Sequence, residues 1–465
     1  MKTLTALTKT LLLVMMVSLS FSCNNDDDNT VIFDPGPTNS IVELAQATPQ
    51  LSSLVSALVK YPDLVTLLSE SGTYTVFAPD NDAFAALLTA IGQTSIDDIP
   101  EDVLKNVLQY HVFTAAAVEA SAVTTGPITM ANNEEANLVA DSNGVSISGA
   151  TVTTADVEGT NGIVHIIDSV IVPPTILPIV GTIVAPAYFN KDFTTLIAAV
   201  QAANTDILGL LLGNGPSDEG LTLFAPTNAA FEAAGIADVN GADAVLAYHV
   251  VDGTIMASML PSTTGAAAGV PTLGGENIYI TNAGGDVSIN GTTTVVATDI
   301  VGSNGVVHVI DRTLIPPTQT INEIVGDFAG GDPAEFTLLA AALARAGLAD
   351  FFAGDGPYTV FAPIDAAFEA AGLDLATINA AEPSVVAGIL THHVVQANVN
   401  VFSTDLVDGN VTMLNEQDVT ISLGDLTVQD ASGSDPAAGL VPSLLNVLAT
   451  NGVVHVIDKV LLPSE

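Results

Sequence analysis

Apolar residues recur at helical spacing in three places along the chain. In the first, Leu104, Val107 and Leu108 are followed by His111, and this i, i+3, i+4, i+7 spacing places all four on one face of a helix. The same pattern recurs at Ala242, Val245, Leu246 and His249 and at Val386, Ile389, Leu390 and His393. The pattern therefore predicts three helices, each with a histidine at the end of its apolar stripe.

A short apolar strand followed by a helix is predicted ahead of each of these helices. The segment 75–79 (TVFAP) is typical of a strand that Pro79 ends, because proline has no N–H to give to a neighbouring strand. Asp80 or Asn81 can cap the next helix. In the third copy Ile364 takes the capping position, and we expect Asp365 to cap the helix one residue later.

The last predicted strand of each copy is buried on both faces. In 451–458 (NGVVHVID), Val453, His455 and Ile457 face one side, and the valines between them face the other. A strand with two apolar faces belongs in the interior of a sheet. Alternating segments that predict hairpins precede this strand at 145–157, 287–300 and 419–430. Because helices come first and strands last in each copy, the fold class is α+β with a mostly antiparallel sheet.

Two motifs recur three times in the same order. The first, which we call the FAP motif, stands at 75–84 (TVFAPDNDAF), 222–231 (TLFAPTNAAF) and 359–368 (TVFAPIDAAF). The second, which we call the octapeptide, stands at 161–168 (NGIVHIID), 304–311 (NGVVHVID) and 451–458 (NGVVHVID). A period of roughly 140 residues indicates tandem whole domains and not a solenoid of small repeats.

The repeats predict three domains, at 40–173, 176–316 and 319–463. The linkers between them are very short, so we expect the three domains to form a stiff rod. We also expect separate cores, so that each domain unfolds in its own step.

The two motifs, with a Tyr-His pair between them, resemble the fasciclin domain, and the resemblance covers nearly all of 40–463. It implies a wedge-shaped, mostly antiparallel β-sandwich with helices packed around it, and a role in cell adhesion or matrix contact. The motif residues to which it assigns structural roles are Phe77, Pro79, Tyr110, His111, His165, Asp168, Phe224, Pro226, Tyr248, His249, His308, Asp311, Phe361, Pro363, His393, His455 and Asp458. The third copy departs from the pattern, because His392 replaces the tyrosine.

The charge of the chain excludes some partners. It carries 51 acidic and 8 basic residues, for a formal net charge of −43. Nucleic acid and anionic lipid headgroups both require clusters of Lys and Arg, so neither is expected as a partner. The acidic surface is interpreted as a means of keeping the protein soluble. No calcium-binding loop motif is present, and no cofactor is expected.

The N-terminal segment is interpreted as a targeting signal. Lys2 and Lys9 precede the apolar run 11–19, which is too short to span a bilayer. Residues 1–22 resemble a lipoprotein signal peptide, and Cys23, the single cysteine of the chain, would carry the lipid. Residues 23–39 form an acidic, flexible tether.

An acidic run after a lipidated cysteine resembles the surface-export signal of Bacteroidetes lipoproteins. It implies a protein anchored in the outer membrane, exposed at the cell surface, and touching the membrane through its lipid alone. The alternative is an ordinary signal peptide with an incidental cysteine.

The motif histidines admit four interpretations. A catalytic role needs a nucleophile or carboxylate held nearby, and no nucleophile-elbow or zinc-protease motif is present. A metal site needs a third ligand that recurs in each copy, and none is found. A place on a binding surface is the third interpretation. Burial with both nitrogens hydrogen-bonded is favoured, so we expect no catalytic residue, no metal ligand and no enzymatic activity.

Two further features of the resemblance concern contacts with partners. Tyr110 and Tyr248 precede motif histidines, and in some animal members this pair contacts receptors; we favour a structural role, because the apolar stripe continues into it. An Asp-Ile pair before the octapeptide is associated with integrin contact in animals. The corresponding candidates are Asp156, Asp299 and Ile300. We interpret this Asp as a turn residue at a strand end and do not extend integrin binding to this chain.

The predicted function is adhesion to extracellular matrix, to a cell-surface protein or to a polysaccharide, through weak contacts made three times. Linked weak sites can raise avidity by about 10²–10⁴. The alternative is a glycan-binding accessory protein that captures polysaccharide. Trp is absent and aromatic residues make up 5% of the chain, which argues against a strong sugar-stacking platform.

Overall fold

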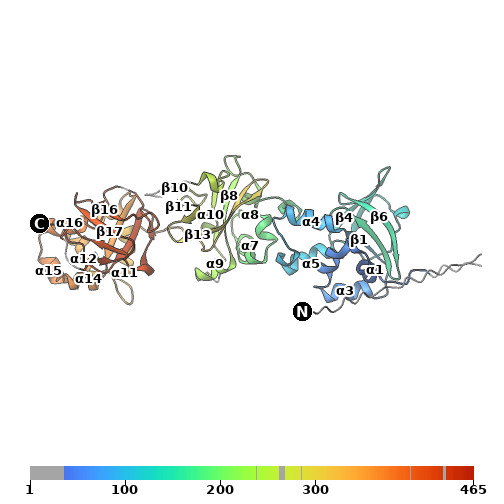
Figure 1. Ribbon diagram of the computed structural model, residues 1–465, viewed down its shortest axis with the longest axis horizontal. Coiled ribbons are helices and arrows are strands. Elements are labelled where there is room, and N and C mark those ends of the chain that lie inside the picture. Colours follow the sequence, from blue (N-terminus) through green and yellow to red (C-terminus); the bar gives the residue numbers. More distant parts are fainter. Residues whose placement is uncertain are drawn as a thin grey trace, which may run out of the picture.

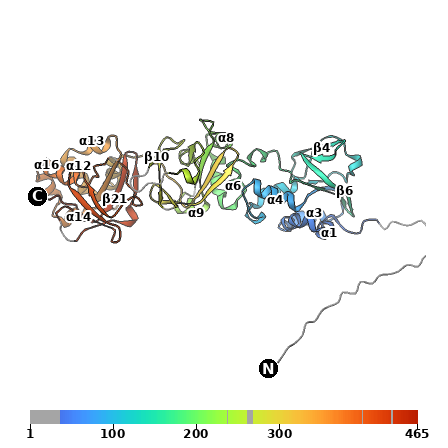
Figure 2. The same ribbon diagram turned by 45° about the horizontal axis from the view of Figure 1, so that its top comes forward.

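The computed structural model describes residues 36–464 apart from 237, 261–267, 284, 398 and 433–435. Three units follow one another in a row along the long axis of the molecule (Figures 1 and 2). We call them domains 1, 2 and 3 in chain order. The predicted signal peptide, Cys23 and most of the predicted tether lie outside the described residues.

In domain 1 most helices precede most strands, as the sequence predicts. A capping box begins the first helix, where Ser40 accepts the N–H of Glu43 and the Glu43 carboxylate accepts the N–H of Ser40. Its helices, with η for 3-10 turns, are α1 (Ile41–Ala47), η1 (Pro49–Leu51), α2 (Ser52–Leu58), α3 (Pro62–Ser69), α4 (Asn81–Ala90), η2 (Ile96–Asp98), α5 (Glu101–Gln109) and η3 (Ala120–Ala122). Its strands are β1 (Tyr74–Pro79), β2 (Val112–Phe113), β3 (Gly126–Thr129), β4 (Glu135–Asp141), β5 (Gly144–Ile147), β6 (Ala150–Gly159) and β7 (Gly162–Ile167). The strand β1 lies between α3 and α4.

Domain 2 repeats this order. Its helices are η4 (Leu177–Ile179), α6 (Ala185–Tyr188), η5 (Lys191–Phe193), α7 (Thr194–Ala202), α8 (Ile207–Leu212), α9 (Asn228–Ala233), α10 (Asp243–Tyr248) and η6 (Ala257–Met259). Its strands are β8 (Leu221–Pro226), β9 (Val250–Asp252), β10 (Ala268–Pro271), β11 (Asn277–Ala283), β12 (Asp286–Ile289), β13 (Thr293–Gly302) and β14 (Gly305–Ile310).

Domain 3 keeps the order with shorter strands. Its helices are α11 (Ile321–Ala329), α12 (Thr337–Ala346), α13 (Ala349–Ala353), α14 (Asp365–Ala370), α15 (Leu375–Ala380), α16 (Pro383–Thr391) and η7 (Pro442–Leu444). Its strands are β15 (Tyr358–Pro363), β16 (Gly409–Thr412), β17 (Asp418–Ser422), β18 (Thr427–Gln429), β19 (Ala438–Gly439), β20 (Val447–Ala449) and β21 (Gly452–Ile457).

The strand of the FAP motif pairs with the strand of the octapeptide in parallel, and the other pairs of strands are antiparallel. In domain 1 the strand order is β2-β1-β7-β6-β5-β4-β3, and Phe77 on β1 lies opposite His165 on β7. The two edges of this sheet approach each other, because the N–H of Ala131 donates to the carbonyl of Val112 at 2.8 Å. The sheet is therefore close to a closed barrel, and the wedge-shaped sandwich expected from the sequence is not confirmed.

The capping expected in the third copy is wrong. Ile364 occupies the N-cap of α14, and no side chain caps that helix. The Asp365 carboxylate instead accepts the N–H groups of Thr337 and Leu338, at the start of α12. The side chain of Asp365 therefore joins the FAP motif to the preceding helix, α12. It does not cap the following helix, α14.

Domains 1 and 2 share one continuous cluster of buried side chains, contrary to the expectation of separate cores, although each also keeps a cluster of its own. One cluster of buried side chains runs from Ile41 in α1 to Val307 in β14. At the boundary, Gln93 donates from Nε2 to the carbonyl of Pro186 at 3.0 Å, and Lys191 donates from Nζ to the carbonyl of Asp97 at 3.0 Å. Domain 3 has two clusters of its own and does not join the shared cluster; its contact with domain 2 is a small cluster in which Tyr279 packs against Phe402 and Val453.

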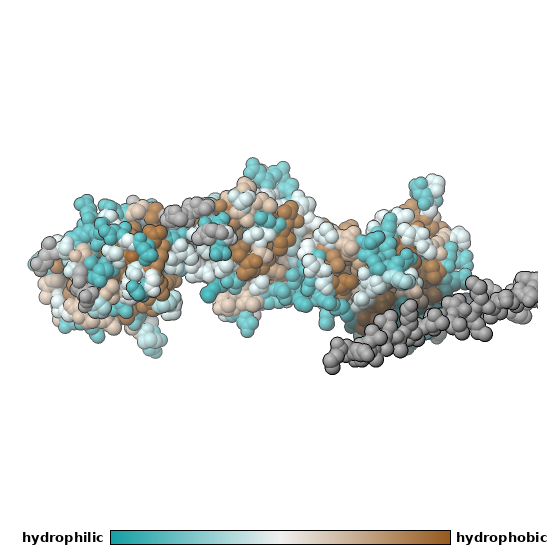
Figure 3. Space-filling model, in the orientation of Figure 1, coloured by the Kyte–Doolittle hydropathy of each residue, from teal (hydrophilic) through white to brown (hydrophobic). Residues whose placement is uncertain are grey.

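The surface mixes polar and apolar side chains. Figure 3 shows hydrophilic and hydrophobic side chains interspersed on one face of all three domains. Among the described residues, no helix combines the length and the apolar character needed to cross a membrane.

Candidate functional site

The octapeptide strand lies at the centre of each domain. On β7, His165 is fully buried, and its ring centroid lies 5.5 Å from that of Phe77 in the FAP motif. The corresponding distances are 5.5 Å between Phe224 and His308 and 5.7 Å between Phe361 and His455. The two motifs therefore meet through an aromatic contact in every domain.

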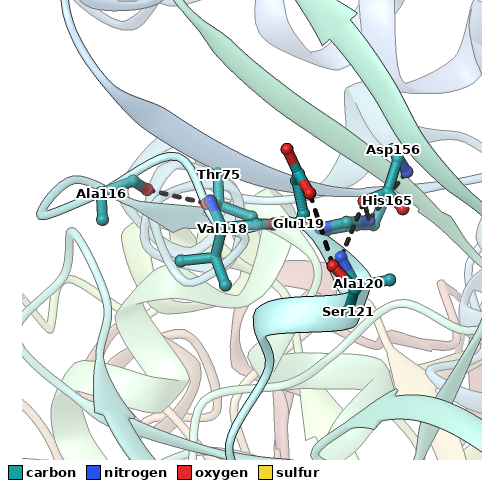
Figure 4. Close-up of polar contacts among 8 residues, drawn as sticks. All are labelled: Thr75, Ala116, Val118, Glu119, Ala120, Ser121, Asp156 and His165. Carbon is teal, nitrogen blue, oxygen red and sulfur yellow. Dashed lines mark hydrogen bonds and ion pairs between the residues drawn. The ribbon is translucent and has the colours of Figure 1, made fainter.

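Both ring nitrogens of His165 are hydrogen-bonded to backbone groups (Figure 4). The N–H of Asp156 donates to Nδ1 at 3.3 Å, so Nδ1 carries no proton. Nε2 lies 2.9 Å from the carbonyl of Val118 and is therefore the protonated nitrogen. This neutral tautomer satisfies the ring completely.

The same two bonds occur in the other domains. His308 bonds Asp299 N at 3.3 Å and Ile255 O at 2.8 Å, and His455 bonds Asn446 N at 3.4 Å and Val401 O at 2.8 Å. A ring with both nitrogens committed to backbone has neither a free lone pair for a metal nor a free nitrogen for proton transfer.

Asp156 does not lie at a strand end, as the sequence interpretation proposed, but inside β6. Its φ is 57°, in the left-handed region, and the register with β7 shifts on either side of Thr154. The residue is therefore part of a β-bulge. Asp299 and Asn446 have the same conformation, with φ of 60° and 58°. Asp and Asn tolerate this conformation better than most other side chains.

The Asp156 side chain has a second task, because its Oδ1 accepts the N–H of Ala120 at 2.7 Å and so caps η3 (Figure 4). Asp299 accepts the N–H of Ala257, and Asn446 accepts that of Ser403, each at 2.7 Å. The Asp or Asn side chain at this position thus makes a hydrogen bond within its own domain. The Asp156 side chain is still 41% exposed, so one face of the carboxylate reaches solvent.

Thr75, which sequence analysis did not single out, also bonds the segment that contacts His165 and Asp156. Thr75 donates from Oγ1 to the carbonyl of Ala116 at 2.8 Å and accepts the N–H of Val118 at 2.9 Å (Figure 4). Thr222 and Thr359 do the same in domains 2 and 3. The signal in the sequence is that all three FAP motifs begin with Thr.

The Asn-Gly pair that opens the octapeptide is typical of a turn, but its asparagine also joins distant parts of the domain. In the structure the Asn161 side chain is buried and joins two helices: Oδ1 accepts the N–H of Ile41 at 2.9 Å, and Nδ2 donates to the carbonyls of Leu68 and Glu70 at 2.8 and 2.9 Å. One amide thus satisfies the start of α1 and the end of α3.

Asn304 and Asn451 make the same three bonds in their domains. Packing explains the glycine that follows the asparagine. A Cβ at Gly162 would lie 2.1 Å from the carbonyl oxygen of Tyr74, too close for any other residue. At the other end of the octapeptide, Asp168, Asp311 and Asp458 accept the N–H groups of Thr151, Thr294 and Gly439. Every polar residue of the octapeptide therefore bonds within its own domain.

The histidine after the middle helix is also buried and fully bonded. His111 donates from Nδ1 to the carbonyl of Val107 at 2.7 Å, and its Nε2 accepts the N–H of Ile171 at 3.1 Å. It ties the end of α5 to the chain that leaves β7. His249 and His393 repeat both bonds.

Burial lowers the pKa of four motif histidines because it penalises the charged ring. The pKa falls to about 4 for His111, His249, His393 and His455, although a carbonyl bonded to each ring opposes the shift. These rings are neutral near pH 7.

Tyr110 and Tyr248 are fully enclosed, and their hydroxyls donate to the carbonyls of Glu135 and Asn277 at 2.8 Å. His392 takes this place in domain 3. Its Nδ1 lies 3.0 Å from Oδ1 of Asn415, and its buried Nε2 has no partner among the described residues. The structure thus leaves the two tyrosines no exposed surface for a receptor.

Ile300 lies at the boundary between domains 1 and 2. A Cβ at Gly92 of domain 1 would be 3.6 Å from its Cγ2, and Ile300 packs against the shared core. Over the part of the chain that the structure describes, no group of three or more His, Cys, Asp or Glu residues is placed to hold a metal ion.

Comparison with known proteins agrees with this geometry. The fasciclin-domain family profile matches residues 49–173, 191–316 and 334–463. Transforming growth factor-beta-induced protein ig-h3 of Sus scrofa is 27% identical over 430 residues, which are 92% of this chain and 58% of that protein. Human periostin is 30% identical over 365 residues, 76% of this chain and 40% of that protein. The chain therefore spans about half the length of these relatives.

A shorter relative is matched over most of its length. Protein sll1483 of Synechocystis is 40% identical over 135 residues, 29% of this chain and 74% of that protein. Among solved structures, a FAS1 domain pair from the insect cell adhesion molecule fasciclin I aligns with 58% of this chain and 97% of that one, at 18% identity and a TM-score of 0.28.

Proposed function

Because the chain belongs to the fasciclin-domain family, we propose that it is an adhesion protein that binds extracellular matrix, a cell-surface protein or a polysaccharide through weak contacts made by three domains. The observation that carries the proposal is the arrangement of three copies of one domain in a row (Figure 1). Repeated sites on one chain raise avidity without a tight site, provided that they engage together.

The motif residues serve this function indirectly. The histidines at 165, 308 and 455 and those at 111, 249 and 393 hold each domain together and do not act as catalysts or metal ligands. Their complete hydrogen bonding to backbone supports this assignment. Exposed residues between the motifs would then contact the partner. Asp156, with its half-exposed carboxylate, is one candidate contact residue.

We further propose domain limits of 40–173, 176–316 and 319–463, preceded by a signal peptide at 1–22 and a tether at 23–39. Lipid on Cys23 would anchor the chain in the outer membrane, facing outward. The excess of 51 acidic over 8 basic residues supports contact with the membrane through the lipid alone.

Single-molecule force spectroscopy tests the adhesion proposal. The full chain with Cys23→Ser, attached to a probe through its N-terminus, is pulled from surfaces coated with matrix protein, with whole cells or with polysaccharide. We expect rupture in up to three steps of similar, low force, and binding that grows steeply with the density of chains. Single strong ruptures, or the same background on all three surfaces, would contradict multivalent adhesion.

A further inference from the structure

A cleft of about 660 Å³ opens between domains 2 and 3. Domain 2 contributes Asn277 and Tyr279 from β11, and domain 3 contributes Asp355 and Asn400 from two loops. The volume lies in the range of sites that bind small molecules, about 300–1,000 Å³. The cleft therefore has the size of a binding site and is built from both domains.

The junction that forms the cleft is held by specific contacts. Thr281 donates from Oγ1 to the buried carboxylate of Asp405 at 2.7 Å, and Asn446 donates from Nδ2 to the carbonyl of Gly291 at 3.0 Å. Across the same boundary the ring of Tyr279 lies 5.5 Å from that of Phe402. These contacts fix the two walls of the cleft relative to each other.

One residue that lines the cleft has a buried polar atom without a partner. Asn400 is 4% exposed, and its Oδ1 makes no hydrogen bond among the described residues. A buried amide oxygen without a donor costs about 1–3 kcal/mol, so such atoms normally face a bound water or ligand. Asn400 also interacts with the side chain of Tyr279, as does Asn277, so polar groups of both domains meet at the cleft.

The chemistry of the lining selects the ligand. Among the described residues, the lining contains amide, hydroxyl and phenol groups, with Asp355 as its one charged side chain and no Lys or Arg. Phosphates and carboxylates would meet acceptors and a negative charge there, which disfavours them. A neutral ligand rich in hydroxyls can donate to Asn400 and accept from the amide donors, and its apolar face can lie on an aromatic ring.

We propose that the cleft between domains 2 and 3 binds a neutral saccharide, with Asn400 accepting a hydroxyl proton and Tyr279 supplying the ring. One tyrosine is a small platform, so the dissociation constant should be on the order of 1 mM. This site is separate from the adhesion proposal, which does not require it.

Saturation-transfer NMR on the Cys23→Ser chain tests the site, with cellobiose, maltose and N,N′-diacetylchitobiose as probes and spermidine as the cationic comparison. We expect saturable binding of at least one disaccharide. Asn400→Ala should weaken it by about tenfold or more, because a hydrogen bond in a buried site is lost. Tyr279→Phe keeps the ring and should weaken it less.

Asn410→Ala is the matched control, since Asn410 lies in domain 3 on β16, bonded to Thr420 and away from the cleft lining. It should bind like the parent chain, and all variants should keep the parent melting temperature of domain 3 to within a few degrees. Absence of saturable binding by every disaccharide, binding of spermidine alone, or undiminished binding by a folded Asn400→Ala variant would each overturn the proposal.

Discussion

The backbone N–H of Asp156 donates to Nδ1 of His165 across 3.3 Å, and this bond fixes the ring in its neutral tautomer with the proton on Nε2. The bond exists only because Asp156 adopts a φ of 57° inside β6. The bulge and the buried histidine thus depend on each other. The left-handed conformation is a physical reason for Asp or Asn to occupy this position in all three domains.

Asp156→Ala should destabilise domain 1 by about 2 kcal/mol. Alanine tolerates the left-handed conformation less well, and the capping bond to Ala120 is lost as well. Asp156→Asn is the control and should cost less than about 0.5 kcal/mol, since Asn446 fills the same place in domain 3. Urea denaturation followed by circular dichroism measures both. Equal losses in the two variants would show that neither the conformation nor the cap matters.

The secondary structure could be predicted from local patterns. The apolar stripe of Leu104, Val107 and Leu108 became α5, although the helix ends before His111, and the two-faced octapeptide became the buried central strand. Tandem domains followed from internal repetition alone. These features depend on residues close together in sequence, where periodicity is informative.

The partners of the polar motif residues could not be predicted. Asn161 bonds Ile41, which is 120 residues earlier, and no local pattern reveals that pairing. The bulge at Asp156 was taken for a turn because Asp favours both. The core shared by domains 1 and 2 was missed because a short linker does not reveal whether apolar faces meet across it.

Asn161→Asp should destabilise domain 1 by about 3 kcal/mol or more. The change keeps the shape of the side chain but replaces the donor that bonds Leu68 and Glu70 with a second acceptor, in a buried place. Asn143→Asp makes the same chemical change at an exposed position and should have little effect. Thermal unfolding of both variants gives the comparison, and similar losses would contradict a role for the buried amide.

Acidification should destabilise the folded chain before its carboxylates titrate. Burial lowers the pKa of His111, His249, His393 and His455 to about 4, whereas an unfolded histidine titrates near 6.5. Between these values the unfolded chain binds protons that the folded chain does not. The stability is therefore complete above pH 6.5 and is lost as the pH falls toward 4.

At pH 5.5 each of these histidines should cost about 1.4 kcal/mol of stability relative to neutral pH. Histidine NMR resonances measured from pH 8 to 5 provide the direct check, with denatured chain as the control. We expect four imidazoles of the folded chain to stay neutral at pH 5.5 while those of the denatured chain are charged. Titration of these four histidines near pH 6.5 in the folded chain would contradict the conclusion that burial lowers their pKa.

Cys23→Ser should release the chain from the membrane fraction, because a lipid on Cys23 is the proposed anchor. The fold should be unchanged, since the described domains begin well after this residue. Fractionation in high salt, with circular dichroism of the released chain, measures both. Substitution of Ser22 by alanine is the control and should leave the chain in the membrane fraction. A Cys23→Ser chain that still sediments with membranes would contradict lipid anchoring.

Unfolding should occur in two steps, with domains 1 and 2 melting together and domain 3 melting alone. The buried cluster that runs from Ile41 to Val307 couples the first two domains, whereas domain 3 has clusters of its own. His165→Ala removes a buried ring and two hydrogen bonds, at a cost of about 2–4 kcal/mol. In scanning calorimetry it should therefore move the joint transition of domains 1 and 2.

His455→Ala is the matched change in domain 3 and should lower only the transition of that domain, by the same amount. Because both rings bond only backbone, neither variant should change the metal content of the purified protein. Three separate transitions in the parent chain would show that the contact between domains 1 and 2 is too weak to couple their unfolding. A His165→Ala chain that melts like the parent but loses a bound ion would instead place the histidine in a metal site.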